Sequence, residues 1–243
     1  MCGRYAITTP PQAMRDLYRY MAQPNFPPRY NVAPTQPVPI VRMNGAAREF
    51  ALVRWGLIPS WAKEMPQSLL INARADTVAD KPSFRGAFRH RRCLMPADGF
   101  YEWKEMGKGA KQPFFIRRRD RAPFAMAALW DNWMSADGSE IETCAVVTTE
   151  ANATLAPVHH RMPVILASDD FDLWLDPAAT PKELAALMVP APDDLLEAIP
   201  VSQAVNRVAN DGPHLTDPFL MPLDATPPKK KEKLADNRQA DLF

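Results

Sequence analysis

The chain has few residues that bind metals or form crosslinks: three cysteines and four histidines among 243 residues. The cysteines show no CxxC spacing, which argues against a disulfide framework and a cysteine-ligated metal site. Cys93 and Cys144 lie in apolar, strand-like runs and are predicted to be buried thiols. A signal-peptide pattern and an apolar run of membrane-spanning length are also missing. We therefore expect a cytoplasmic protein without a metal ion or cofactor.

Glycine is scarce as well, with 9 residues against 26 prolines. This balance favours many short strands and fixed loops over a helical bundle or a regular βαβ repeat. The Asn44-Gly45 pair between two apolar runs is typical of a hairpin turn. We predict an α+β fold in which a curved, largely antiparallel, barrel-like sheet is flanked by short helices. The clearest predicted strands cover residues 38–43, 49–55, 92–95, 113–118, 124–130 and 141–148.

The predicted helices are short and are placed by apolar spacing and by capping residues. Thr9 is expected to cap the first helix and Ser168 a later one. Residues 201–206 are expected to return as a strand or a loop. The predicted helices cover residues 10–20, 83–89, 169–175, 182–188 and 193–198.

Charge is unevenly distributed along the chain, although the net charge is only +1. Residues 1–121 carry a net charge of +12 and residues 122–243 a net charge of −11. Arginine clusters bind phosphates, and exposed aromatic residues such as Trp61 stack on unpaired bases. The first half is therefore compatible with a nucleic-acid partner, whereas the alternative is a solvated basic face with structural tryptophans.

Cys2 becomes the first residue if the initiator methionine is removed, which is usual when the second residue is small. It then carries an α-amine and a thiol on adjacent carbons, and both groups titrate close enough to neutrality to be nucleophilic. An aldehyde condenses with the amine to an imine, and the thiol closes on the imine carbon to give a thiazolidine. Gly3 permits close approach of a ligand and Arg4 adds a cation. The alternative is that these residues only begin an edge strand.

Three further polar positions stand out along the chain. Asn72 follows an apolar run and can orient a hydroxyl as both donor and acceptor, unless it only satisfies a loop backbone. Glu102 alternates with aromatic residues on a predicted strand, where burial would raise its pKa toward the range of a proton shuttle; the alternative is an exposed carboxylate. His159 and His160 precede Arg161, which suggests a histidine that transfers protons beside an arginine that binds a phosphate. The alternative is an ordinary strand start.

Several stretches taken together resemble the SRAP (SOS-response-associated peptidase) family. These are the Met-Cys-Gly-Arg-Tyr start, Ile-Asn-Ala-Arg at 71–74, Asp-Gly-Phe-Tyr-Glu-Trp at 98–103 and His-His-Arg-Met-Pro at 159–163. The resemblance also runs through Tyr-Asn-Val-Ala-Pro at 30–34, Trp-Gly-Leu-Ile-Pro at 55–59 and Val-Ser at 201–202. It covers roughly residues 2–220, and we expect one SRAP domain over residues 1–223.

The resemblance implies a sensor of abasic sites in single-stranded DNA that acts in the SOS response, and we expect it to be a monomer. Such a protein forms a thiazolidine DNA–protein crosslink, which protects the strand from cleavage. By this resemblance Cys2 is the crosslinking nucleophile, Asn72 contacts the abasic sugar, and Glu102 and His159 are the acid–base residues. The second position of the histidine motif is often acidic in the family and is His160 here. The residues then expected to bind DNA are Gly3, Arg4, Trp61, Arg74, Arg85, Thr149 and Arg161.

The last twenty residues change composition and are expected to form a disordered basic tail, residues 224–243. The tail ends in Gln-Ala-Asp-Leu-Phe, which resembles the bacterial pentapeptide that binds the sliding clamp. In that resemblance Gln239, Leu242 and Phe243 make the contact, and the tether raises the local concentration at replication forks on the nucleoid. The alternative is a plain tail with a chance match.

Two other functions fit part of the sequence. Class II glutamine amidotransferases also begin with Met-Cys-Gly and use the freed cysteine against an amide, but the later motifs do not fit them. A non-catalytic module that binds single-stranded DNA would use the basic residues alone, with Cys2 incidental.

Overall fold

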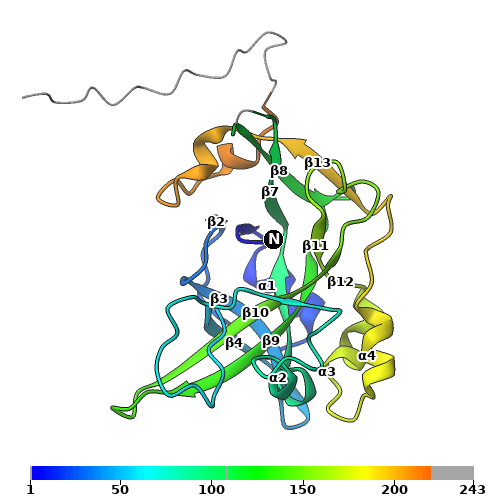
Figure 1. The fold of residues 1–243 in the computed structure, drawn as a ribbon. Coiled ribbons are helices and arrows are strands. Elements are labelled where there is room, and N and C mark those ends of the chain that lie inside the picture. The colour runs from blue at the N-terminus through cyan, green and yellow to red at the C-terminus, as the bar shows by residue number, and fades with distance from the viewer. Residues whose placement is uncertain (1, 108, 220–243) are drawn as a thin grey trace, which may run out of the picture.

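The computed structural model describes residues 2–107 and 109–219 (Figure 1). None of the helices in this part of the chain has both the length and the apolar character needed to cross a membrane. Strands dominate, as the proline and glycine balance predicts. In chain order the elements are β1 (Tyr5–Ile7), α1 (Pro11–Tyr18), β2 (Arg29–Val32), β3 (Pro37–Asn44), β4 (Ala47–Trp55), β5 (Asn72–Arg74), α2 (Arg85–His90), β6 (Arg92–Ala97), β7 (Gly99–Glu105), β8 (Lys111–Arg118), β9 (Phe124–Met134), β10 (Glu140–Glu150), β11 (Arg161–Pro163), β12 (Ile165–Leu166), η1 (Ser168–Asp170), α3 (Phe171–Leu175), α4 (Pro181–Leu187), β13 (Leu196–Pro200), η2 (Gln203–Asn206) and η3 (Pro213–Thr216), where η marks a 3-10 helix.

Five strands close into a barrel. They follow the order β10-β4-β3-β6-β9, and a further pairing of β9 with β10 completes the ring. All pairings in the ring are antiparallel except that of β4 with β10. Apolar residues such as Val41, Leu94 and Val146 are fully buried in the core. The predicted α+β fold with a curved, largely antiparallel sheet is therefore confirmed.

A second sheet carries the amino-terminal strand. Its order is β13-β8-β7-β1-β2, and each pairing is antiparallel. The strand β1 thus lies between β7 and β2 (Figure 1). Gly99 at the start of β7 allows close packing, because a Cβ there would lie 2.3 Å from the Phe115 ring and 2.7 Å from the Ile116 carbonyl oxygen.

Hairpins and most helices follow the local signals. The turn at Asn44-Gly45 joins β3 to β4, and Gly45 adopts a φ of 60°, which glycine tolerates. The helix α4 begins with a capping box in which Thr180 and Glu183 bond reciprocally. The thiols of Cys93 and Cys144 are free and buried, as predicted.

Four expectations about elements are wrong. Residues 193–198 do not form a helix, because residues 196–200 are strand β13, paired with β8. Residues 203–206 form η2 rather than a strand or loop, and Ser202 caps it. Thr9 does not cap α1, since its hydroxyl donates to Asp98, and Pro10 is the cap residue. Ser168 likewise makes no cap bond and opens η1 ahead of α3.

Candidate active site at the amino-terminal strand

The pairing of β1 with β7 brings Glu102 next to the start of the chain. Tyr5 pairs with Phe100, and the Tyr101 N–H donates to the Arg4 carbonyl oxygen at 2.9 Å. Continued by two residues from the Tyr5–Phe100 pair, this register sets Glu102 opposite Gly3 and beside Cys2. The Cys2 side chain is fully buried, and the Arg4 backbone N–H donates to its sulfur. Strand pairing therefore joins a nucleophile to a carboxyl group that is distant in sequence.

Asn72 approaches the same point from the barrel. It begins β5, which pairs in parallel with β10 so that Asn72 faces Val146. Its Nδ2 donates to the Cys2 carbonyl oxygen at 2.9 Å. Its Oδ1 is buried and accepts no hydrogen bond from the residues the structure describes. The side chain thus anchors Cys2 and retains an acceptor for a ligand.

Burial shapes the acid–base properties of this site. Glu102 is 3% exposed, and desolvation raises the pKa of its carboxyl group. The amino-terminal charge, a backbone N–H bond from Trp103 and the charge on His160 act in the opposite direction. Burial also raises the pKa of the Cys2 thiol, and the negative charge of Glu102 raises it further. Both groups therefore favour their protonated forms more than they would in water.

The charge on His160 acts on Glu102, and His159 lies next to His160. The rings of His159 and His160 stack with centroids 4.4 Å apart and an interplanar angle of 29°. His159 is half-buried, and the Arg161 N–H donates to its Nδ1 at 3.0 Å in the tautomer protonated on Nε2. Burial lowers the pKa of His159, whereas the pKa of the exposed His160 is lowered mainly by the charge on His159. His159 therefore has the more fixed ring, and His160 faces solvent.

Arg161 lies on β11 and Arg74 on β5, and both strands pair with the end of β10. Arg161 is 7% exposed, and its Nη2 donates to the Thr148 carbonyl oxygen at 2.5 Å. Arg74 is exposed and forms a bidentate pair with Asp76, with N–O distances of 3.1 and 2.7 Å. Both cations are thus held by the protein at this edge of the barrel.

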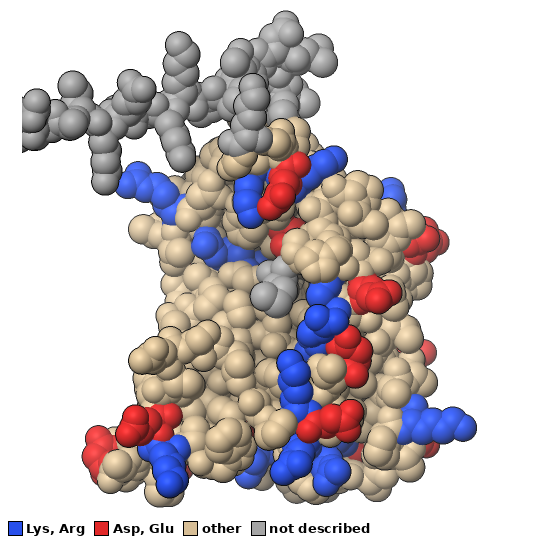
Figure 2. Space-filling view, viewed as in Figure 1, with Lys and Arg blue, Asp and Glu red and all other residues tan. Residues whose placement is uncertain are grey.

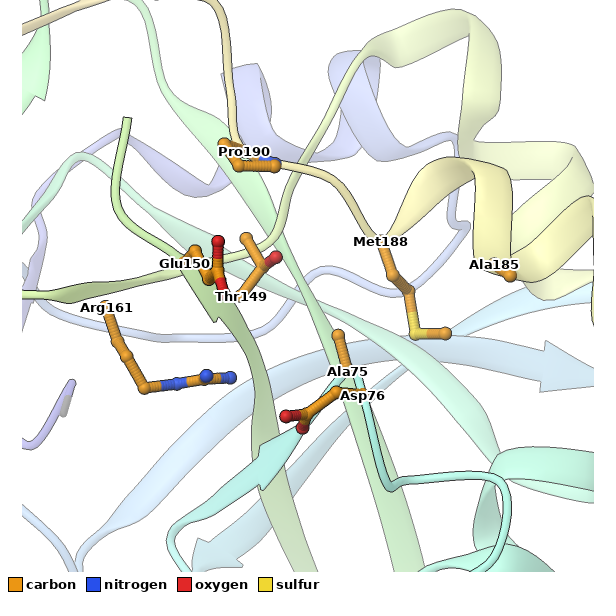
Figure 3. Close-up of a pocket in the computed structure, with 8 residues that line it drawn as sticks. All are labelled: Ala75, Asp76, Thr149, Glu150, Arg161, Ala185, Met188 and Pro190. Carbon is orange, nitrogen blue, oxygen red and sulfur yellow. The ribbon is translucent and has the colours of Figure 1, made fainter. Parts of the chain in front are cut away.

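A cavity of about 250 Å³ opens beside Arg161 (Figure 3). Figure 3 shows the Arg161 guanidinium and the Asp76 carboxylate extending toward one another, with Met188 reaching into the same space. Thr149, which the sequence marks as a DNA ligand, lies in its wall and is 8% exposed. The remaining lining residues are Ala75, Glu150, Ala185 and Pro190.

The Arg4 guanidinium faces into the protein. Its Nη1 donates to Asn31 Oδ1 and to the Val205 carbonyl oxygen, each at 2.8 Å, and its Cζ lies 5.9 Å from the centroid of the Trp103 ring. Sequence reasoning missed these partners. The available signal for the Asn31 partner was a polar residue within an apolar strand.

Trp61 and Arg85 lie together in a different cavity, of about 400 Å³. Trp61 is 64% exposed, and its Nε1 donates to the Pro82 carbonyl oxygen at 3.3 Å. This cavity shares no lining residue with the one beside Arg161. The clamp-binding residues Gln239, Leu242 and Phe243 lie outside the described residues. No group of three or more His, Cys, Asp or Glu side chains within residues 2–107 and 109–219 is arranged to hold a metal ion.

Comparison with known proteins gives a consistent result. The family model described as SOS response associated peptidase (SRAP) matches residues 1–208. The Abasic site processing protein YoaM of Bacillus subtilis is 38% identical, over 89% of this chain and 98% of that protein. YedK of Escherichia coli, with the same description, is 33% identical over 90% and 100%, and HMCES of Gallus gallus is 31% identical over 98% and 82%. A crystal structure of a protein from Bacteroides thetaiotaomicron superposes with a TM-score of 0.82 at 27% identity, over 90% of this chain and all of that one.

Proposed function

The chain belongs to the SOS response associated peptidase (SRAP) family, and on that premise we propose that it detects and crosslinks abasic sites in single-stranded DNA. Relatives from bacteria and a vertebrate carry the name abasic site processing protein. The reacting group is Cys2 after removal of Met1, and the product is a thiazolidine. Any peptidase activity is the self-directed removal of Met1.

The convergence of Cys2, Asn72 and Glu102 carries this proposal. The three residues come from β5, β7 and the start of the chain, and the bond from Asn72 Nδ2 to the Cys2 carbonyl oxygen measures 2.9 Å. Cys2 occupies the one position at which a cysteine can supply both an amine and a thiol. A purely structural cysteine would not need a buried carboxyl group and a spare amide acceptor beside it.

Ring opening of the abasic sugar is the first task of the site. An abasic deoxyribose exists mainly as a closed hemiacetal, so a proton must leave the anomeric hydroxyl and another must reach the ring oxygen. Glu102 transfers these protons, and the raised pKa of its carboxyl group suits it to both directions. His159 assists from the other side, and the free Oδ1 of Asn72 accepts a hydrogen bond from a sugar hydroxyl.

Crosslinking then takes two bond-forming steps. The α-amine attacks the C1′ aldehyde, and loss of one water gives an imine. The Cys2 sulfur next bonds to the imine carbon while its proton passes to the nitrogen, which closes the five-membered ring. Because burial raises the pKa of the thiol, the thiol is protonated at neutral pH, so the amine reacts first, and Glu102 relays the thiol proton to the nitrogen during ring closure. The product has no free aldehyde, which suppresses β-elimination of the DNA strand.

Basic residues next to the site hold the DNA strand. Arg74 and Arg161 bind phosphates on the side of the histidines, with Thr149 between them, and Gly3 lets the sugar approach the backbone. Trp61 and Arg85 form a second contact, in which a base stacks on the exposed indole. Arg4 contributes mainly through contacts inside the protein, since its guanidinium already donates hydrogen bonds to Asn31 and Val205.

The tail is proposed to add a second partner. Residues 224–243 follow the domain, 1–223, and their last five residues bind the sliding clamp through Gln239, Leu242 and Phe243. Tethering to the clamp places the protein on the nucleoid at replication forks.

A crosslinking assay tests the catalytic proposal. The protein is incubated with single-stranded DNA that carries one abasic site and is then run on a denaturing gel. We expect a covalent band that is lost in Cys2→Ala and retained in the matched variant Cys93→Ala. Salt-sensitive binding without a band in the wild type would support a simple binding module, and ammonia release from glutamine would support an amidotransferase; either result would overturn the proposal.

A further inference from the structure

The cavity beside Arg161 has features that the crosslinking chemistry does not use. It is bounded by the end of β5, by the last residues of β10 and by the segment that follows α4 (Figure 3). Its volume of about 250 Å³ is below the roughly 300–1,000 Å³ of pockets for drug-sized ligands. The cavity therefore suits one small planar ring.

One wall of the cavity is apolar. Met188 is 8% exposed and extends its side chain into the space, and Ala185 and Pro190 also line the cavity (Figure 3). Thioether sulfur packs favourably against aromatic rings and adapts to their shape. This wall matches the face of a nucleobase.

The opposite wall carries unused hydrogen-bonding groups. The Thr149 side chain is 8% exposed and lines the cavity, and its hydroxyl has no hydrogen bond to the described residues. Glu150 also lines the cavity and forms no ion pair within the described part of the chain. Asp76, by contrast, is occupied by its bidentate pair with Arg74. Glu150 is exposed and its charge acts on Arg161 and Arg74, but among the described residues no ion pair holds it, so it is the carboxylate of this cavity that can turn to a ligand.

We propose that this cavity receives the base of a nucleotide that flanks the abasic site, and that Glu150 makes it prefer cytosine to thymine. The inference rests on the proposed function, because the DNA strand reaches the cavity through the phosphate contacts of Arg161 and Arg74. The Thr149 hydroxyl either donates or accepts and therefore binds any base.

The preference follows from the chemistry of the two pyrimidines. Cytosine presents an N4 amine, which donates to a carboxylate, whereas thymine presents the O4 carbonyl at the equivalent position. A carboxylate only accepts hydrogen bonds, so it repels that carbonyl. The two rings have nearly the same size. Thymine also carries a C5 methyl group and, at N3, a donor where cytosine has an acceptor, so the comparison with Glu150→Gln is what assigns the preference to the carboxylate.

The test measures binding to single-stranded oligonucleotides that contain the unreactive tetrahydrofuran analogue of an abasic site. Cytosine or thymine is placed on the 5′ or the 3′ side, and Kd is determined by fluorescence anisotropy. We expect cytosine to bind about tenfold more tightly on one side, the effect of one hydrogen bond to a charged group. In Glu150→Gln the amide offers both a donor and an acceptor, so the preference should fall to about twofold or less.

The matched control is Glu140→Gln, which alters an exposed carboxylate at the other end of β10 and should keep the preference. The inference would be overturned if the wild type bound cytosine and thymine oligonucleotides with equal affinity at both flanking positions. It would also be overturned if the preference for cytosine survived in Glu150→Gln. The analogue does not react with Cys2. The measurement therefore reports on the cavity even if crosslinking itself fails.

Discussion

Glu102 lies in an environment that is unusual for a carboxylate. It sits within a strand, is 3% exposed, and has a pKa raised first of all by burial. The nearby Cys2 thiol shares this environment, and its pKa rises for the same reason. At the scale of single residues, burial therefore keeps a proton available where the sugar must open.

Replacing Glu102 by Gln should slow crosslinking by about 10²–10⁴-fold, the usual contribution of a general acid–base group. DNA affinity should change little, since the amide keeps the size of the side chain. In the wild type the rate should increase with pH through the raised pKa of Glu102, because deprotonation gives the base form. Glu102→Gln should keep only the increase that comes from deprotonation of the α-amine. Single-turnover rates from pH 5 to pH 8 and Kd for intact DNA provide the comparison.

The exposed Glu105 on the same strand supplies the control, and Glu105→Gln should behave as the wild type. An equal loss of rate and of affinity in Glu102→Gln would mean that the residue supports the fold rather than the chemistry.

Sequence reasoning reaches some of these residues and not others. Glu102 was predictable because strand alternation and aromatic neighbours mark it, and Cys2 because of its position in the chain. The internal partners of Arg4 were not predictable, since Val205 lies 201 residues away and bonds through its backbone. Glu150 was missed because its importance depends on Met188 and on a cavity that only the fold creates.

At the scale of elements, β1 is fixed by more than strand pairing. Asn31 on β2 is 1% exposed, and its Nδ2 donates to the carbonyl oxygens of Val205, Arg207 and Asn210 at 3.2, 3.1 and 2.8 Å. Its Oδ1 accepts from Arg4. One amide thus ties the segment around η2 to Arg4, in the short segment between Cys2 and β1.

Asn31→Ala should lower the free energy of unfolding by about 1–3 kcal/mol, because it leaves buried carbonyl groups and a guanidinium without partners. Urea denaturation monitored by tryptophan fluorescence measures the change. Asn25→Ala, at an exposed position, should have no comparable effect. A stability equal to that of the wild type would show that water replaces these bonds and that the network does not hold β1.

The wrong element predictions share a physical cause. The spacing at 193–198 predicts a helix, but β8 offers an open edge, and residues 196–200 pair with it as β13. By local rules Thr9 would cap α1, but its hydroxyl donates a hydrogen bond to Asp98 instead. In both cases a tertiary partner that the local pattern does not contain decides the structure. The β3–β4 hairpin needed no such partner, because both strands and their turn lie in one continuous stretch of sequence.

At the scale of the whole molecule, ion pairs join the basic and acidic halves of the chain. Each pair is partly exposed, so its contribution to stability is small. The pairs instead occupy arginines that the sequence alone would assign to a free basic face, and Figure 2 shows Lys and Arg side chains interspersed with Asp and Glu. The ion pairs that join the two halves are Arg29–Asp211, Arg42–Glu142, Arg48–Asp172, Arg91–Asp131 and Arg117–Glu197.

The tail can be tested separately from the domain. Deleting residues 239–243 should abolish association with the sliding clamp, measured by surface plasmon resonance on immobilised clamp, because it removes the Leu242-Phe243 anchor. Crosslinking to abasic DNA should continue at the wild-type rate. If association with the clamp survives the deletion, the tail is not the element that binds the clamp.

The intact mass of the crosslinked product tests the central claim most directly. Protein expressed in full length is reacted with an abasic oligonucleotide, treated with borohydride and analysed under denaturing conditions. The expected mass is that of the chain without Met1 plus the oligonucleotide minus one water, unchanged by borohydride, because a closed thiazolidine has no imine to reduce. An adduct that retains Met1, one that gains two hydrogens on reduction, or no adduct at all would contradict the account.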